Sequence, residues 1–98
     1  MTAFTPASAD RTRPELRGTF GFAASTHWLA TGTAQSVLER GGTAVDAAVA
    51  AAFVLHVVEP HLNGPGGDLT AIVAPAREHP FVLAGQGAAP AAATIERY

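Results

Sequence analysis

Hydrophobic and polar positions along the chain follow extended and helical patterns in turn. Residues 18–25, GTFGFAAS, place Phe20 and Phe22 two positions apart, on one face of an extended chain, and we expect this run to form a buried strand. Residues 69–74 (LTAIVA) and 81–84 (FVLA) also have β-type composition, and the segment between them is bounded by prolines. These two runs predict a hairpin.

Between these runs the apolar spacing becomes helical. Ser25 or Thr26 is the expected N-cap of a helix that runs to about residue 40. Its apolar residues recur at i, i+4, i+7 and i+8 and form one stripe, made of Ala30, Ala34, Val37 and Leu38. Two glycines, Gly41 and Gly42, should end this helix, because glycine adopts a left-handed conformation at little cost.

A second helix is predicted over residues 44–58. Thr43 is the expected N-cap, and Asp46 three residues later completes a capping-box-like pair. Nearly every residue of this helix is apolar, so we expect it to be buried on all sides. Pro60 should end it by biasing Glu59 away from helical geometry. Residues 61–68 then form a glycine-rich loop before the hairpin.

The predicted order is strand, helix, helix, strand, strand. It indicates an α+β fold in layers, with the helices on one side. We expect residues 1–17, rich in Pro, Ser, Thr and Ala, to be a flexible leader, and residues 18–98 to form one segment of an incomplete domain.

Composition adds an expectation about surroundings. Of the 98 residues, 48% are hydrophobic and 14% are charged, which is low for the surface of a small free-standing domain. We therefore expect further protein to cover part of this surface. A net charge of -2 argues against nucleic-acid or anionic-membrane partners. There is no cysteine, no secretory signal pattern and no membrane-length apolar run, so a cytoplasmic location is expected.

Candidate chemistry in the chain is sparse. The glycines of residues 64–67 suggest a phosphate loop, but they precede a strand and lack the Gly-Lys-Ser/Thr signature, so a structural turn is the better interpretation. His56, Glu59, His61 and Asp68 lack metal-ligand spacing, and we expect no metal and no cofactor. His27 and Trp28 fit packing better than catalysis. The serines lie in no nucleophile elbow, so we predict no catalytic residue in this chain.

Several motifs in order resemble the N-terminal part of the γ-glutamyltransferase (γ-glutamyltranspeptidase) family. They are GFAAS at 21–25, VLERGGTAVDAAVA at 37–50, VVEP at 57–60, GPGGD at 64–68 and APAAAT at 89–94. The resemblance implies the N-terminal portion of the large subunit of an αββα N-terminal-nucleophile hydrolase. In that family the precursor cuts itself, and the new N-terminal threonine of the small subunit attacks the γ-glutamyl amide. That threonine lies far downstream in relatives, so we predict that this chain alone is inactive.

The resemblance also places one substrate contact. The family holds the substrate α-carboxylate with an arginine in an R-E-x-A-P segment, and Gln86 takes its place here. A variant of the motif carries an arginine where Ala88 stands. Gln86 is thus the candidate substrate-binding residue, although a loop residue without a ligand is an equal alternative. The Gly-Gly-Asp and Gly-Gln-Gly runs resemble the acylase-like, cytoplasmic branch. With both arginines absent, this resemblance implies a substrate other than glutathione: another γ-glutamyl or glutaryl amide, or one that the sequence leaves undefined.

Two hypotheses remain at this point. In the first, the chain is part of a γ-glutamyltransferase-like amide hydrolase, and its partners are the rest of the large subunit and the threonine-bearing small subunit. In the second, it is a small non-catalytic module that binds a partner through the apolar helix 44–58.

Overall fold

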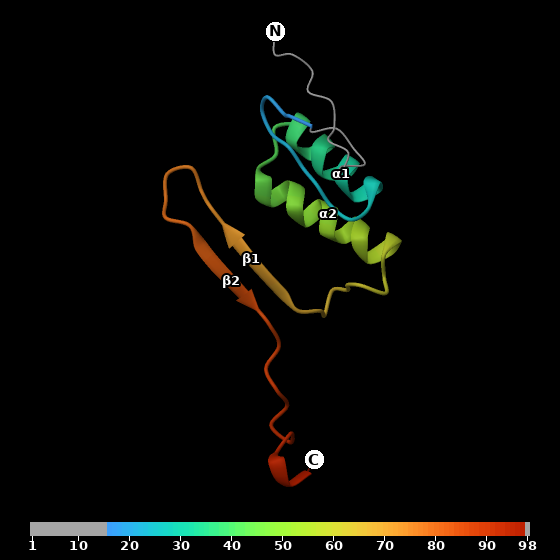
Figure 1. Ribbon diagram of the computed structural model, residues 1–98, viewed down its shortest axis with the longest axis vertical. Coiled ribbons are helices and arrows are strands. Elements are labelled where there is room, and N and C mark those ends of the chain that lie inside the picture. The colour runs from blue at the N-terminus through green and yellow to red at the C-terminus, as the bar shows by residue number, and fades with distance from the viewer. Residues whose placement is uncertain (1–15, 98) are drawn as a thin grey trace, which may run out of the picture. The chain divides into compact units, whose positions relative to one another are not determined.

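The computed structural model describes residues 16–97. Its elements are α1 (Trp28–Glu39), α2 (Ala44–Val58), β1 (Leu69–Val73), β2 (Phe81–Gly85) and a short 3-10 turn at Ile95–Arg97 (Figure 1). They divide between two compact units, Met1–Glu59 with both helices and Pro60–Tyr98 with both strands. The predicted α+β class is confirmed. The predicted leader, 1–17, lies almost wholly outside the described residues.

The start of α1 differs from the prediction. Its N-cap is His27, whose Nδ1 accepts the Leu29 N–H at 3.2 Å, and not Ser25 or Thr26. Ser25 instead donates its hydroxyl to the His27 carbonyl at 2.8 Å and shares a hydrogen bond with the Thr31 hydroxyl at 2.7 Å. The polar residues before the helix therefore order its entry, while the imidazole takes the capping position.

The end of α1 follows the glycine prediction. Gly41 has φ +87, in the left-handed region that favours glycine. Its N–H donates to the Leu38 carbonyl at 3.0 Å, and the Gly42 N–H donates to the Val37 carbonyl at 2.9 Å. This pair of bonds is the Schellman motif, which satisfies two of the carbonyls left open at a helix end.

The capping box of α2 is confirmed atom by atom. The Asp46 N–H donates to the Thr43 hydroxyl oxygen at 3.2 Å, and the Thr43 N–H donates to Asp46 Oδ2 at 2.8 Å. At the other end Glu59 is the C-cap, directly before Pro60. The sequence signals at both ends of this helix thus give its bounds.

The helices α1 and α2 pack side by side through small residues (Figure 1). The buried core consists of four alanines, two from each helix, with larger side chains half-buried around it: Ala30, Ala34, Ala47 and Ala51. Val37 and Leu38 pack against this cluster, as the predicted stripe requires. Alanine at each contact point lets the two helix backbones approach closely.

The prediction that helix 44–58 is buried on all sides is wrong for the described structure. Side chains four residues apart on α2 are 51–78% exposed and form one continuous apolar stripe: Val45, Val49, Phe53 and Val57. The residues are apolar all round, as noted, but burial depends on what surrounds a helix, and α1 covers one side only. We call these four residues the α2 stripe.

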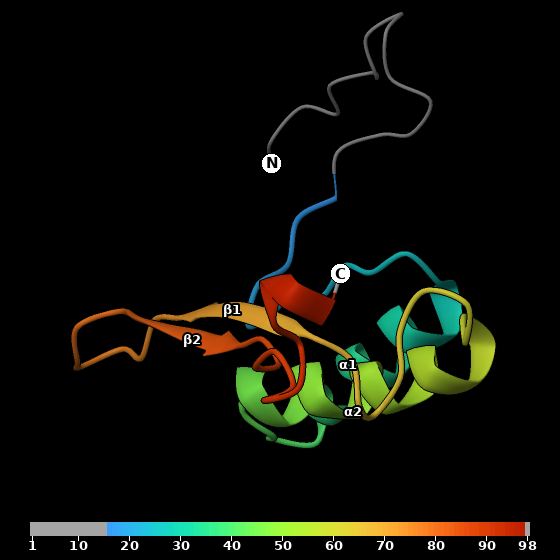
Figure 2. The ribbon, with the colours of Figure 1, turned by 90° about the horizontal axis from the view of Figure 1, so that it is seen from below.

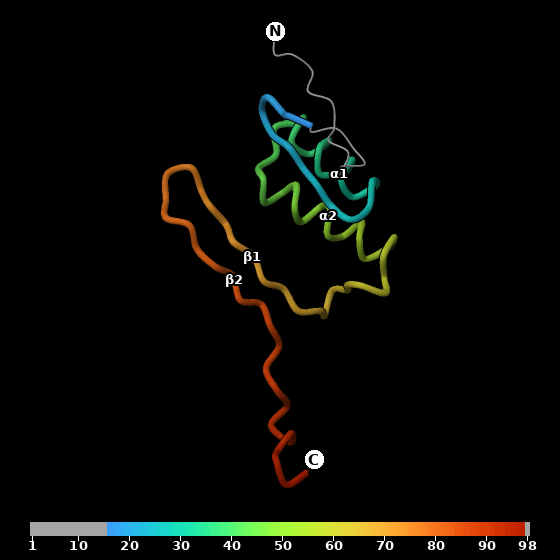
Figure 3. The backbone as a smooth tube through the Cα atoms, viewed as in Figure 1, coloured from blue at the N-terminus to red at the C-terminus, as the bar shows by residue number. Residues whose placement is uncertain are grey.

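The strand predicted at residues 18–25 is also absent. This segment bends at residues 19–20 and carries no strand assignment (Figure 3). Phe20 and Phe22 are 66% and 55% exposed. A strand requires a partner to bond its backbone groups, and none pairs with this segment among residues 16–97. Ala23 packs on the alanine core instead, and Leu38 lies close to Gly21.

The hairpin forms as predicted, to within one residue at each strand end. β1 and β2 are antiparallel, with the pairs running from Val73↔Phe81 at the turn to Leu69↔Gly85 at the open end (Figure 2). Apolar residues occupy both faces, and Ile72 and Val82 are 78% and 68% exposed on one of them. Strands that are apolar on both faces are typical of sheets covered on both sides.

Candidate functional site

The glycine-rich loop before β1 contains a tight turn. The Gly67 N–H donates to the Gly64 carbonyl at 3.0 Å, which agrees with a structural turn at this loop. A Cβ on Gly67 would lie 3.2 Å from that same carbonyl oxygen, so the turn leaves little room for a side chain. The turn is followed by Asp68, the residue immediately before β1.

Asp68 joins the two ends of the hairpin. Its Oδ1 accepts the Gly87 N–H at 2.9 Å, across 19 positions of sequence. The backbone hydrogen bonds between the strands end at the Leu69↔Gly85 pair. At Gly87, two residues after Gly85, the Asp68 carboxylate accepts the N–H in place of a main-chain carbonyl. We call Asp68, Gly85, Gln86 and Gly87 the hairpin base.

Gln86, the predicted substrate-binding residue, lies within the hairpin base and is exposed. It stands between Gly85, whose Cβ position would lie 3.1 Å from the Leu69 carbonyl oxygen, and Gly87, whose N–H is held by Asp68. The backbone is restrained before Gln86 by the Leu69↔Gly85 pair and after it by the Asp68 bond, while the exposed side chain is left to contact other groups. Its role in binding stays a prediction.

Three of the four residues weighed as metal ligands, His56, Glu59 and Asp68, have other contacts. His56 contacts the Phe53 ring edge-on at 5.5 Å between ring centres, and Glu59 accepts the Thr26 hydroxyl at 2.5 Å. Asp68 belongs to the other unit and bonds Gly87. Across residues 16–97 no three His, Cys, Asp or Glu side chains are grouped to hold a metal ion.

Over the same residues, no helix has the length and apolarity to cross a membrane.

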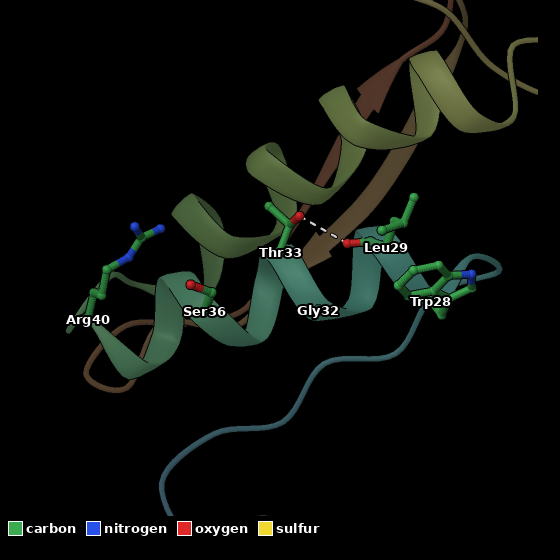
Figure 4. A pocket seen from close by; sticks show the side chains of 6 residues that line it. All are labelled: Trp28, Leu29, Gly32, Thr33, Ser36 and Arg40. Carbon is green, nitrogen blue, oxygen red and sulfur yellow. Dashed lines mark hydrogen bonds between the residues drawn. The ribbon is translucent and has the colours of Figure 1, made fainter.

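A shallow groove of about 380 Å³ runs along the exposed side of α1 (Figure 4). It is lined by residues of this helix and its C-cap: Trp28, Leu29, Gly32, Thr33, Ser36 and Arg40. The Thr33 hydroxyl donates to the Leu29 carbonyl at 2.9 Å, so it is occupied by the backbone. Trp28 is 75% exposed and stacks on His27, so it is not packed inside as expected. The residues that line the groove include no histidine, carboxylate or lysine that could act as a general base for its two hydroxyls. The groove therefore does not resemble the site of a serine or threonine nucleophile.

Two exposed carboxyls have pKa values below their usual range, and both shifts have structural causes. The Thr43 hydroxyl and N–H lower the pKa of Asp46 from its usual 3.8. The backbone N–H of Glu96 itself and the Thr94 hydroxyl lower the pKa of Glu96. Both groups stabilise turns and helix ends, so neither shift points to acid–base catalysis.

The described residues therefore define an α+β protein whose glycine-rich motif and Gln86 segment meet at the base of one hairpin. The model of the family described as gamma-glutamyltranspeptidase matches residues 30–98. The chain belongs to this family.

Individual relatives agree. The chain is 42% identical over 80 residues to an oxamate amidohydrolase proenzyme of Klebsiella pneumoniae, a match covering 82% of this chain and 15% of the relative. It is 39% identical over 82 residues to acylase ACY 1 proenzyme of Pseudomonas sp. strain SE83, covering 83% and 14%. The crystal structure of Helicobacter pylori gamma-glutamyltranspeptidase superimposes with a TM-score of 0.76 at 41% identity, covering 83% of this chain and 23% of that one. The chain thus spans about one-seventh of the length of these curated relatives.

The family motif led to the prediction of Gln86, which stays a prediction, whereas sequence reasoning missed the Asp68–Gly87 bond. A signal for it was present: an Asp directly before one strand of a hairpin and a glycine just after its partner are brought opposite each other once the register is known.

Proposed function

We propose that this chain forms the N-terminal part of the large subunit of a γ-glutamyltransferase-like amide hydrolase or transferase with the αββα fold. Family membership over residues 30–98 is the observation that carries the proposal. Residues 18–98 supply helices and a hairpin, and a threonine on a further segment supplies the nucleophile, with its own α-amine as the base.

The exposed apolar surfaces support a role as part of a larger assembly. The α2 stripe and both faces of the hairpin present valine, phenylalanine and isoleucine to solvent in this chain. Contiguous apolar patches of this kind mark protein–protein contacts. The rest of the large subunit and the small subunit are the partners that we propose for them.

The hairpin base is the proposed contact to the substrate. Gln86 is a neutral hydrogen-bonding side chain where the family motif has an arginine, so it would hold a carboxylate or amide without a charge of its own. The similarity to amidohydrolase and acylase proenzymes supports an acyl amide as the substrate. Our proposal is that this is a γ-glutamyl or glutaryl amide, and that it is cleaved in the cytoplasm.

The α2 stripe also favours a second candidate, a non-catalytic module that binds a partner through helix 44–58. Its test is the behaviour of the purified 98-residue chain. A monomer that melts cooperatively supports the module. Aggregation that is relieved by co-expression of the segment encoded after Tyr98 supports the hydrolase part.

The coding sequence after Tyr98 tests the leading proposal independently. We expect it to continue in frame to a threonine at a self-cleavage site, and we call that longer product the full-length enzyme. A stop codon directly after Tyr98, with no separately encoded threonine-bearing partner, would contradict the proposal.

A further inference from the structure

We propose that Asp68 is a positioning residue that fixes the backbone of Gln86 for substrate binding. The inference rests on the proposed function, since it takes Gln86 as the substrate contact. The proposed function gives no role to Asp68, the last residue of the GPGGD motif, and this inference supplies one.

The geometry carries the inference. The ladder between β1 and β2 stops at Leu69↔Gly85, and beyond that pair no backbone bond of the sheet holds residues 86 and 87. The Asp68 Oδ1 bond to the Gly87 N–H, at 2.9 Å, extends the restraint past Gln86. An ionised acceptor makes such a bond shorter and stronger than a neutral one does.

The neighbouring glycines explain why the restraint is needed. Gly85 and Gly87 flank Gln86, and glycine has more conformational freedom than any other residue. Without the Asp68 bond, Gln86 would sit in a segment with a broad choice of conformations. A contact that is ordered before binding loses less entropy when the substrate arrives.

The side-chain length of aspartate suits this position. A Cβ on Gly87 would lie 3.6 Å from Asp68 Oδ1, so the carboxylate already lies against the glycine backbone. Asparagine has the same length and retains a carbonyl oxygen as acceptor, whereas alanine has none. Comparing Asp68→Asn with Asp68→Ala therefore tests whether a hydrogen-bond acceptor is needed at position 68.

The experiment measures kcat and KM of the full-length enzyme with γ-glutamyl-p-nitroanilide and glutaryl-p-nitroanilide. For Asp68→Ala we expect KM to rise about tenfold on the better substrate, the size expected for loss of one charge-assisted hydrogen bond, with kcat within about twofold. Asp68→Asn should stay within about threefold of the parent in KM. Glu78→Ala, which removes an exposed carboxylate from the hairpin turn, is the matched control and should leave both constants unchanged.

A double-mutant cycle distinguishes positioning from general stability. If Asp68 acts through Gln86, the KM of Gln86→Ala should change less than twofold when Asp68→Ala is added. Additive effects, or an Asp68→Ala enzyme equal to the parent, would overturn the role of Asp68 and leave the proposed function intact. A parent enzyme without turnover of either amide would overturn the proposed function, and this inference with it.

Discussion

At the scale of single residues, glycines and short polar side chains decide where each element stops. Among residues 16–97, Gly41 alone has a positive φ, +87, which residues with a side chain rarely adopt. Thr43 and Asp46 form the reciprocal bonds that start α2. Asp68 and Gly87 close the open end of the hairpin. Each of these positions gives a substitution whose effect follows from one interaction.

The left-handed backbone of Gly41 predicts a cost for any side chain there. Gly41→Ala should lower the free energy of unfolding by about 1–2 kcal/mol, because a Cβ is strained at positive φ. Gly32→Ala is the matched control: Gly32 lies inside α1 with no atom within 4 Å of its Cβ position, so this change should raise stability by about 0.5–1 kcal/mol. Urea denaturation of both variants measures the difference. Equal effects at the two glycines would contradict the Schellman end of α1.

The pKa of Asp46 predicts an acid-sensitive helix start. Because hydrogen bonds from Thr43 hold this pKa below 3.8, the unfolded chain binds the proton at a higher pH than the folded chain does. The contribution of Asp46 is therefore complete above about 3.8 and is lost as the pH falls through the lower folded value. Asp46→Asn should show a flatter loss of stability with falling pH in this window, measured by circular dichroism melts at several pH values. Parallel curves for the two proteins would show that the capping box does not contribute.

At the scale of elements, the sequence predicted what is local and failed where the outcome depends on surroundings. Both helices and the hairpin followed from caps, apolar spacing and turn residues that act within a few positions of themselves. The prediction of a strand at 18–25 was wrong because a strand needs a paired neighbour, which no local sequence pattern supplies. The prediction that α2 is buried on all sides was wrong for a related reason. An apolar composition allows a helix to be buried, but the neighbouring elements determine which of its faces are covered. Asp68–Gly87 was missed because it joins distant positions.

The alanine contact between α1 and α2 predicts sensitivity to added volume. Ala34 is 4% exposed at this contact, so Ala34→Leu should force the helices apart and cost about 1–3 kcal/mol. Ala52→Leu adds the same atoms on an exposed position of α2 and should be nearly neutral. Thermal unfolding of both variants provides the measurement, and a neutral Ala34→Leu would refute the close-packed alanine contact.

At the scale of the whole molecule, the chain combines a small core with a large apolar surface. Its described core consists of four alanines, whereas valines and phenylalanines of α2 and the hairpin are exposed. Exposed apolar patches of this kind are typical of protein–protein contacts, and the chain spans 15% of the length of the oxamate amidohydrolase proenzyme that it resembles. We therefore propose that the substrate contact lies in this chain and that the nucleophile lies on a further segment.

The release of p-nitroaniline from γ-glutamyl-p-nitroanilide and glutaryl-p-nitroanilide tests that division most directly. The purified 98-residue chain should give no release above the uncatalysed rate, and the full-length enzyme should hydrolyse at least one of the two amides after self-cleavage at its threonine. Turnover by the 98 residues alone, or a self-cleaved full-length enzyme inactive on both amides, would contradict the account.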